Sequence, residues 1–394
     1  MNAESPSPES PSSPESPSPE APSRPQPSPP ESPSPQPSPP LLQVRDLVVE
    51  FATRHGRARV LDRVSLGVAR GEILGLVGES GCGKSMTALA ILGLVPGPAG
   101  RIAGGSIQLE ARELTGLGDE SLRRIRGKDI GMIFQEPMSS LNPVFTVGEQ
   151  IAESVRLHEN AGRKAAWARA VDMLKAVDIP EPAARARAYP HQLSGGMRQR
   201  VMIAIALACR PRVLIADEPT TALDTTVQAQ IFDLLRDLQR DTGAAIILIT
   251  HDMGAVAELA DRVAVMYAGR VVEQGGVAQV LSAPRHPYTR GLSACVPHLD
   301  TGPGGDGDGD GDGDGGGDGD GDGTGDGDGD GDGAGRRELV EIPGVVPSLF
   351  AMPRGCAFAP RCADAVEKCA SERPAMRAIP AAAGHAAACW VTAG

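Results

Sequence analysis

The sequence lacks any apolar run long enough to cross a bilayer. Its longest apolar stretches, residues 201–209 and 244–249, fall short of the roughly 18 residues that a spanning helix needs and have the length of buried core elements. The N-terminal residues carry neither the basic region nor the apolar region of a secretion signal. We therefore expect a cytoplasmic protein, and other chains must supply any membrane-spanning part.

Two tracts lack apolar residues almost completely. Residues 1–40 repeat Pro, Ser and Glu, and residues 301–335 are nearly all Gly and Asp. Neither can bury enough surface to offset the entropy of ordering, so we expect both to be disordered. The rest is long enough for one sizeable domain, at 41–275, followed by the start of an extension at 276–300 and a small Cys-containing extension at 336–394.

The net charge of the chain does not indicate what kind of partner it binds. The twelve aspartates of 306–332, with the five glutamates and one arginine of 1–40, account for −16, against −12 for the whole chain. The remaining residues therefore carry about +4, and the acidity gives no argument for a nucleic-acid-binding surface.

Short apolar segments alternate with helical ones between the two tracts. Residues 41–71 alternate at period two and predict antiparallel strands. Residues 72–78 (EILGLVG) are continuously apolar, as a strand buried on both faces should be. A helical insertion is expected at about 141–193, and the helix from 225 should end on Gly243. Further strands are expected at 212–217, 244–250 and 262–274. This alternation predicts an α/β fold with a mostly parallel sheet.

The segment GESGCGKS at 78–85 predicts a phosphate-binding loop. Its glycines allow successive N–H groups to form an anion nest, which the following helix N-terminus reinforces. Lys84 would reach the β- and γ-phosphates, and the Ser85 hydroxyl would bind Mg²⁺. The pattern fixes only four positions, but a buried strand before it and a helix after it strengthen it. The nucleotide-binding candidates here are Gly78, Glu79, Ser80, Gly81, Cys82, Gly83, Lys84, Ser85 and Met86.

A second candidate lies in VLIADEP, residues 213–219. Asp217 and Glu218 end a buried strand, where ligands bind in open α/β sheets. Asp217 would hold the Mg²⁺ shell, and Glu218 could accept a proton from an attacking water. Alone, the pair could also be ordinary solvated acids at a strand end.

With further motifs the sequence resembles ATP-binding cassette ATPases. LSGGMRQR (193–200) resembles the family signature, and TALD (221–224) the loop that reaches across the dimer through Asp224. Gln135 in MIFQE resembles the residue that links the active site to the membrane partner. The resemblance implies a P-loop NTPase cassette with a RecA-like core, an antiparallel β subdomain and a helical subdomain.

The resemblance also implies roles for individual residues. His251 would orient the attacking water, although a lone histidine is more often structural, and Phe51 would stack on adenine, although such an aromatic often only packs. Catalysis would rest on Glu218, His251 and Gln135. Mg²⁺ would be held by Ser85, Gln135 and Asp217, and the ATP of the partner cassette by Ser194, Gly195, Gly196 and Met197, with methionine where glutamine is commonest.

A narrower resemblance, to the ATPase subunits of dipeptide/oligopeptide and nickel importers, covers 132–151, 189–211, 286–297 and 341–362. It implies uptake energised at the cytoplasmic face of the cell membrane. The partners would be a second, related cassette subunit (a homodimer being the alternative), two transmembrane permeases and, through them, an extracytoplasmic solute-binding protein. The Gly-Asp tract departs from the pattern, and we interpret it as a linker.

Four of the seven cysteines, Cys356, Cys362, Cys369 and Cys389, lie in the tail. Their spacing is not the tight C-x₂-C of zinc ribbons. Four thiolates suit an iron–sulfur cluster or zinc, and the resemblance favours [4Fe–4S] over zinc; reduced, unligated cysteines are the alternative.

Two other cassette functions compete with import. A soluble cassette ATPase of DNA repair or translation usually has two cassettes or a long coiled coil, and neither pattern is present. A catalytically dead cassette would not be expected to keep Lys84, Asp217, Glu218 and His251 together. Nothing in the sequence names the transported solute.

Overall fold

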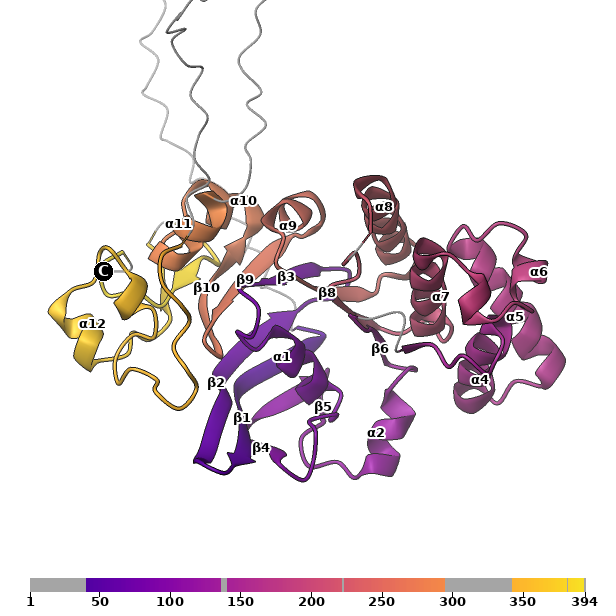
Figure 1. Cartoon of the computed structure of the whole chain (residues 1–394), viewed down its shortest axis with the longest axis horizontal. Coiled ribbons are helices and arrows are strands. Elements are labelled where there is room, and N and C mark those ends of the chain that lie inside the picture. The colour runs from indigo at the N-terminus through magenta and orange to yellow at the C-terminus, as the bar shows by residue number, and fades with distance from the viewer. Residues whose placement is uncertain (1–39, 136–139, 222, 295–341, 381, 393–394) are drawn as a thin grey trace, which may run out of the picture. The chain divides into compact units, whose positions relative to one another are not determined.

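The computed structural model of the chain describes residues 40–135, 140–221, 223–294, 342–380 and 382–392. Helices surround two β-sheets, and the elements follow the expected α/β alternation (Figure 1). None of the helices within these ranges is both long enough and apolar enough to cross a membrane.

The smaller sheet is antiparallel. Strands β1 (Leu42–Thr53) and β2 (Gly56–Val68) form the hairpin predicted from the alternating pattern. Strands β4 (Gly100–Leu109) and β5 (Arg112–Glu113) complete it in the order β2-β1-β4-β5. Its inward-facing side chains are buried because residues two apart share one face of a strand.

The larger sheet carries the parallel strands expected from the sequence. In order these are β9 (Arg262–Tyr267), β3 (Ile73–Val77), β8 (Ala245–Thr250), β7 (Val213–Asp217) and β6 (Ile130–Ile133). Every residue of β3, β7 and β8 is buried, which explains their continuous apolar sequences. Their carboxyl ends meet at one edge, where the site is built.

The prediction of one strand over 262–274 was wrong. The segment folds back as the hairpin β9–β10, with β10 at Arg270–Gly276 antiparallel to β9. Ala268 and Gly269 form the turn with φ of 47° and 78°, and two successive positive φ values match the twist of a tight hairpin. Alanine rarely adopts such a φ, so the turn could not be predicted from its residue types.

Helices cover both faces of the larger sheet. Helix α1 (Lys84–Ile91) and the smaller sheet pack on one side with Leu74 and Leu76 of β3. On the other side, Ile73 belongs to a core with the helices of the 141–207 region. Those helices are α4 (Val147–Glu159), α5 (Arg163–Ala176), α6 (Pro182–Arg185), the 3₁₀ turn η1 (Pro190–Gln192) and α7 (Gly195–Leu207).

The remaining helices connect strands or follow the last one. Helix α8 (Thr225–Thr242) ends on Gly243 with φ of 64°, as predicted. The others are α2 (Asp119–Ile125), α9 (Met253–Leu259), α10 (Val277–Ser282) and α11 (Pro287–Ala294). In Figure 1 the group α4–α7 lies beyond the β6 edge of the sheet, and the tail lies at the β10 edge.

The tail from residue 342 has little regular structure. It contains η2 (Ala359–Arg361), α12 (Glu367–Ser371), β11 (Arg377–Ala378) and β12 (Ala386–Ala387). Strand β12 pairs with β10, and β11 with β12, so the tail extends the larger sheet. Phe358 is buried against Tyr267 and Tyr288, with ring centroids 5.2 and 5.5 Å apart.

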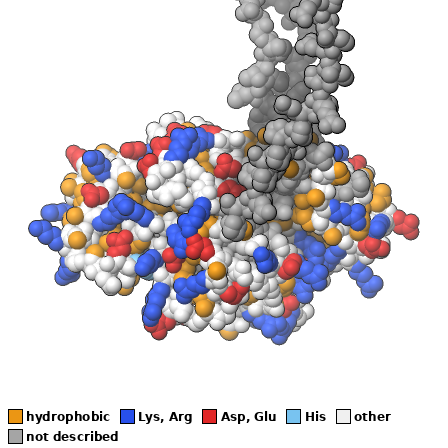
Figure 2. Space-filling model, turned by 180° about the vertical axis from the view of Figure 1, so that it is seen from behind, with side chains coloured by type: hydrophobic (Ala, Val, Ile, Leu, Met, Phe, Trp, Pro, Cys, Tyr) orange, Lys and Arg blue, Asp and Glu red, His pale blue; other side chains and the backbone are white. Residues whose placement is uncertain are grey.

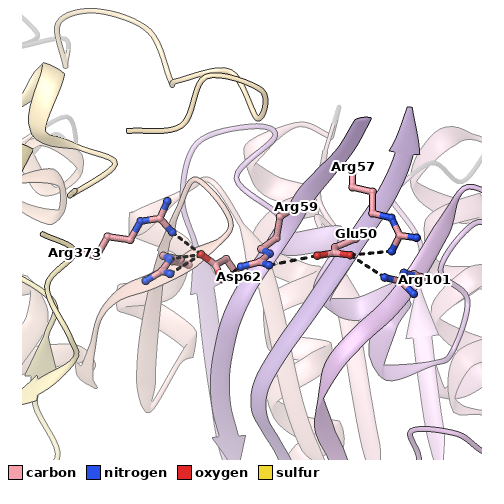
Figure 3. A network of polar contacts seen from close by, with 7 residues as sticks. Glu50, Arg57, Arg59, Asp62, Arg101 and Arg373 are labelled. Carbon is pink, nitrogen blue, oxygen red and sulfur yellow. Dashed lines mark hydrogen bonds and ion pairs between the residues drawn. The ribbon is translucent and has the colours of Figure 1, made fainter. Parts of the chain in front are cut away.

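Ion pairs join the tail to the smaller sheet (Figure 3). The Asp62 carboxylate accepts from Arg59 at 3.1 Å and Arg373 of the tail at 2.7 Å, and it also pairs with Arg270. Burial alone would raise the pKa of Asp62, but the guanidinium groups of Arg270 and Arg59 outweigh it and lower the pKa. On the face shown in Figure 2, charges of both signs are interspersed, in keeping with the small net charge outside the two tracts.

Candidate nucleotide site

The phosphate-loop sequence forms a tight turn between β3 and α1. Gly78, Gly81 and Gly83 all have positive φ, at 150°, 78° and 110°. A Cβ atom on Gly78 would lie 2.2 Å from the Met266 carbonyl oxygen, so only glycine fits there. The strand–loop–helix context that the motif requires is therefore present.

Lys84 is enclosed by this loop. The residue is only 5% exposed, and its Nζ donates to the carbonyl oxygens of Gly78 at 2.7 Å and Glu79 at 3.2 Å. A lysine at the first position of a helix in this loop can contact bound phosphate. Its ammonium and the helix N-terminus both attract an anion to the same place.

Ser85 and Asp217 meet although 132 positions separate them. The Ser85 hydroxyl donates to Asp217 Oδ1 at 3.1 Å, at the carboxyl end of β7. Burial raises the pKa of Asp217 above its ordinary value, against the opposing hydrogen bond from Ser85. A cation would stabilise the charged form, and a hydroxyl with a carboxylate is the oxygen pair that Mg²⁺ prefers.

Glu218 contacts both of the other predicted catalytic residues, Gln135 and His251. Its Oε2 accepts from Gln135 Nε2 at 2.9 Å, and its Oε1 lies 3.4 Å from His251 Nδ1. Thr221, which the sequence did not single out, donates to Oε2 at 3.0 Å. Burial alone would raise the pKa of Glu218, but the bonds from Thr221 and His251 outweigh it, and the pKa is lowered. The carboxylate is therefore ionised, as a proton acceptor must be.

The signature residues begin helix α7. Ser194 caps it by accepting the Met197 N–H at 3.3 Å. Asp224 caps α8 in the same way, accepting the Val227 N–H at 2.9 Å. A Cβ on Gly196 would lie 3.4 Å from Val227 Cγ1, so the starts of α7 and α8 are neighbours. A Cβ on Gly195 would meet nothing within 4 Å, so the backbone there is open. The open backbone at the start of a 13-residue helix suits an anion supplied from outside.

Other predicted residues have different surroundings. Phe51 on β1 is half-buried, and its ring lies so close to Gly100 that a Cβ there would be 2.8 Å away. Cys82 is buried, and burial raises the pKa of its thiol. Ser80 is exposed, and Met86 packs against the core beside α1. The adenine-stacking role of Phe51 remains a prediction.

Glu79 is held by residues outside the motif. Its N–H donates to the Tyr288 hydroxyl at 2.8 Å, and its carboxylate pairs with Arg361 of the tail. Both partners lie in segments that carry the narrower resemblance, 286–297 and 341–362, but the sequence assigned neither of them a role at the phosphate loop.

The four tail cysteines line one small cavity, beside Phe358 and Trp390. Their thiols are free. Burial raises the pKa of Cys356 and Cys362, and the neighbouring thiols contribute to the rise. Across the described ranges, no group of three or more His, Cys, Asp or Glu side chains is arranged to hold a metal ion. The thiol donors are of the type that metal centres use, but their arrangement in this structure is not that of a metal site.

Comparison with known proteins decides the family. Residues 61–221 match the family described as ABC transporter, and residues 272–308 and 332–369 match the oligopeptide/dipeptide transporter C-terminal region. A "probable peptide ABC transporter ATP-binding protein" of Sinorhizobium fredii is 47% identical over 350 residues, covering 89% of this chain and 94% of that protein. The chain belongs to the ABC transporter ATP-binding family.

Other relatives agree with this membership. The dipeptide transport ATP-binding protein DppD of Escherichia coli is 43% identical over 339 residues, covering 86% of this chain and 93% of that protein. A solved dimer of an ATP-binding cassette, bound to ADP and phosphate after hydrolysis, has a TM-score of 0.55 and 28% identity, covering 60% of this chain and 98% of that one. ATP hydrolysis is inherent to this ABC ATPase family, and the cassette fold predicted from the sequence is confirmed.

Proposed function

We propose that this ABC ATPase energises the import of di- and oligopeptides across the cell membrane. The observation that carries the proposal is the convergence of Gln135, Thr221 and His251 on the Glu218 carboxylate, near the Ser85–Asp217 pair. The choice of peptide rests on the relatives, which are named for peptide and dipeptide transport. The tail, which matches the family's C-terminal region, supports the same choice.

Each group in the site has a role in hydrolysis. Lys84 and the loop N–H groups bind the β- and γ-phosphates, and Ser85 and Asp217 hold Mg²⁺, which neutralises developing negative charge. Glu218 accepts the proton of the attacking water. Gln135 and His251 orient that water and the γ-phosphate, since both already bond to the same carboxylate.

A complete site needs a second cassette. The open start of α7 at Ser194 and Gly195 would bind the γ-phosphate held by a partner, and Asp224 lies beside it at the start of α8. A dimeric relative supports this arrangement. We favour a related but distinct cassette subunit as the partner, with two permeases carrying the solute and a solute-binding protein delivering it.

An exposed apolar loop suits contact with the permeases. Val144 and Phe145 are 70% and 53% exposed, just before α4. Gln150 fixes this loop by donating to the carbonyl oxygens of Asn142 and Phe145 and by accepting the Asn142 N–H. A preformed apolar pair close in sequence to Gln135 would dock a membrane subunit and place the ATPase at the cytoplasmic face of the membrane.

The tail would hold a [4Fe–4S] cluster. Four thiols that line one cavity would supply its four thiolate ligands. The cluster would tie the short tail together. Anaerobically purified protein should contain iron, labile sulfide and a visible absorption band, and Cys362→Ser should lose all three. Zinc instead of iron, or no metal, would refute this part.

Uptake tests the main proposal. In a strain from which this ATPase has been deleted, the reintroduced wild type should restore uptake of labelled dipeptide, whereas Lys84→Ala should not. Lys164→Ala, an exposed lysine on α5, is the matched control and should behave as wild type. Normal peptide uptake without the ATPase, with loss of a different solute's uptake, would overturn the peptide assignment.

A further inference from the structure

A buried arginine of the tail binds the phosphate loop. Arg361 lies at the end of η2, and its side chain is only 5% exposed. Its Nη1 donates to Glu79 Oε2 at 2.9 Å, and its Nη2 donates to Oε1 at 3.1 Å. The bidentate pair joins residues 282 positions apart. Such a planar fork fixes the orientation of a carboxylate as well as its distance.

Glu79 in turn contacts Lys84, the lysine of the phosphate loop. Its carbonyl oxygen accepts a bond from Lys84 Nζ at 3.2 Å, and its N–H donates to Tyr288 at 2.8 Å. The carboxylate, the carbonyl and the N–H of this loop residue are therefore all engaged. Two of the partners, Arg361 and Tyr288, belong to the region after the cassette.

Arg361 is itself held firmly. Its Nε donates to the Pro343 carbonyl at 2.8 Å, and its Nη2 also donates to the Ile342 carbonyl at 3.1 Å. The guanidinium lies 5.8 Å from the ring centres of Tyr267 and Phe358. A side chain fixed on three sides can hold the loop in one conformation at little further entropic cost.

We infer that Arg361 is a positioning residue for ATP binding: it holds Glu79, and through it Lys84 and the phosphate loop, in the nucleotide-binding conformation. The inference rests on the proposed function, because it assigns a new residue to the same nucleotide site. ATP affinity thus depends on the docked tail. Arg361 directly precedes Cys362. A change in the conformation of Cys362 would therefore move Arg361, and through its side chain the phosphate loop.

The contact should affect ATP binding more than the chemical step. Gln135 and His251 each contact Glu218, and none of these three residues is bonded to Arg361 in the described structure. Once ATP saturates the site, loop conformation no longer limits turnover. We therefore expect Arg361→Met, which keeps the side-chain length, to weaken ATP binding about tenfold, with a similar rise in KM and less than a twofold change in kcat.

The matched control is Arg373→Met. This second tail arginine donates to Asp62 of the smaller sheet at 2.7 Å and has no bond to the phosphate loop (Figure 3). The Arg373→Met substitution should lower the unfolding temperature of the full chain without changing its affinity for ATP. Arg361→Lys, which keeps the charge but loses the bidentate fork, should fall between wild type and Arg361→Met.

A double-mutant cycle separates positioning from simple tail stability. Glu79→Gln removes the same pair from the other side and should also weaken ATP binding about tenfold. The combination Arg361→Met with Glu79→Gln should be no worse than either change alone. Calorimetric titration of the full chain with ATP and Mg²⁺ gives the dissociation constants, and it remains informative through Glu79→Gln if the tail variant does not fold.

Two kinds of failure are distinguishable. If wild type binds no ATP, the proposed function fails. If wild type binds and hydrolyses ATP while Arg361→Met and Glu79→Gln leave its affinity unchanged, only the positioning role is overturned. The same conclusion would follow if Arg361→Met and Arg373→Met reduced stability equally and affinity not at all.

Discussion

Replacing Glu273 by glutamine should loosen the tail from the cassette. Glu273 on β10 is fully buried, and its carboxylate accepts the N–H groups of Arg285 at 2.7 Å and His286 at 2.8 Å. Its Oε1 also lies 2.7 Å from His385 Nε2 of the tail, which is itself buried. Three donors therefore converge on one carboxylate at the place where the tail joins the sheet.

The free-energy cost of Glu273→Gln follows from the number of donors that its carboxylate accepts. Glutamine keeps one oxygen and turns the other into an NH₂ group that faces a donor. The variant loses at least one charge-assisted hydrogen bond and leaves a buried N–H unsatisfied, which together cost about 3 kcal/mol. That corresponds to about a hundredfold change in the equilibrium between docked and undocked tail.

The assay uses the chain's two tryptophans. Trp167 lies in α5 and Trp390 in the tail, so in a Trp167→Phe background the fluorescence of Trp390 follows the tail alone. Lys368, which also belongs to the tail, has its Nζ 3.8 Å from the centre of the Trp390 ring, so unfolding of the tail should separate the two and change the emission. Urea titrations then give the free energy of tail unfolding.

The control is the same substitution at an exposed site. The Glu372 side chain forms a surface pair with Lys368 at 3.6 Å, and its main-chain oxygen accepts the Trp390 indole N–H whatever the side chain is, so Glu372→Gln should change stability by less than about 0.5 kcal/mol. Equal effects of Glu273→Gln and Glu372→Gln would refute the argument that the buried carboxylate docks the tail.

Three other predictions concern the cassette. Glu218→Gln should bind ATP with Mg²⁺ normally but hydrolyse it about a hundredfold or more slowly, measured as phosphate release; undiminished turnover would remove Glu218 from the role of base. Gly78→Ala should weaken ATP binding more than tenfold by calorimetry, because its Cβ would strike the Met266 carbonyl, and normal affinity would contradict this loop geometry. The lowered pKa of Asp62 means that its contribution to stability is complete above its ordinary pKa of about 4 and is lost as pH falls through the lower folded value. Asp62→Asn should therefore show a smaller loss of unfolding temperature on acidification than wild type, and parallel curves would refute this.

Much of the nucleotide site could be predicted because it obeys strong local rules. Glycines that need positive φ, a lysine at a helix start and acids at the end of a buried strand leave clear patterns. Parallel strands then bring their carboxyl ends together, which is why Ser85 meets Asp217 and why Gln135, Glu218 and His251 meet although the sequence separates them.

The contacts of the tail could not be predicted for a physical reason. Arg361 and Glu79 form a pair whose members are far apart, and neither sits in a periodic segment. The turn at Ala268 was missed because its positive φ is imposed by the surrounding sheet rather than by local preference. The clustering of four cysteines in the tail singled them out in the sequence, but only the structure places all four around one cavity.

The pairing of β12 with β10 means that the tail is bound much as a separate peptide would be, by main-chain bonds at a sheet edge. The covalent connection contributes mainly a high local concentration of the tail. Cleaving the chain between residues 301 and 335 would turn docking into an association of two molecules with its own dissociation constant. The tail would then be an exchangeable part, so a cassette could be paired with tails of different cysteine content without altering its own sequence.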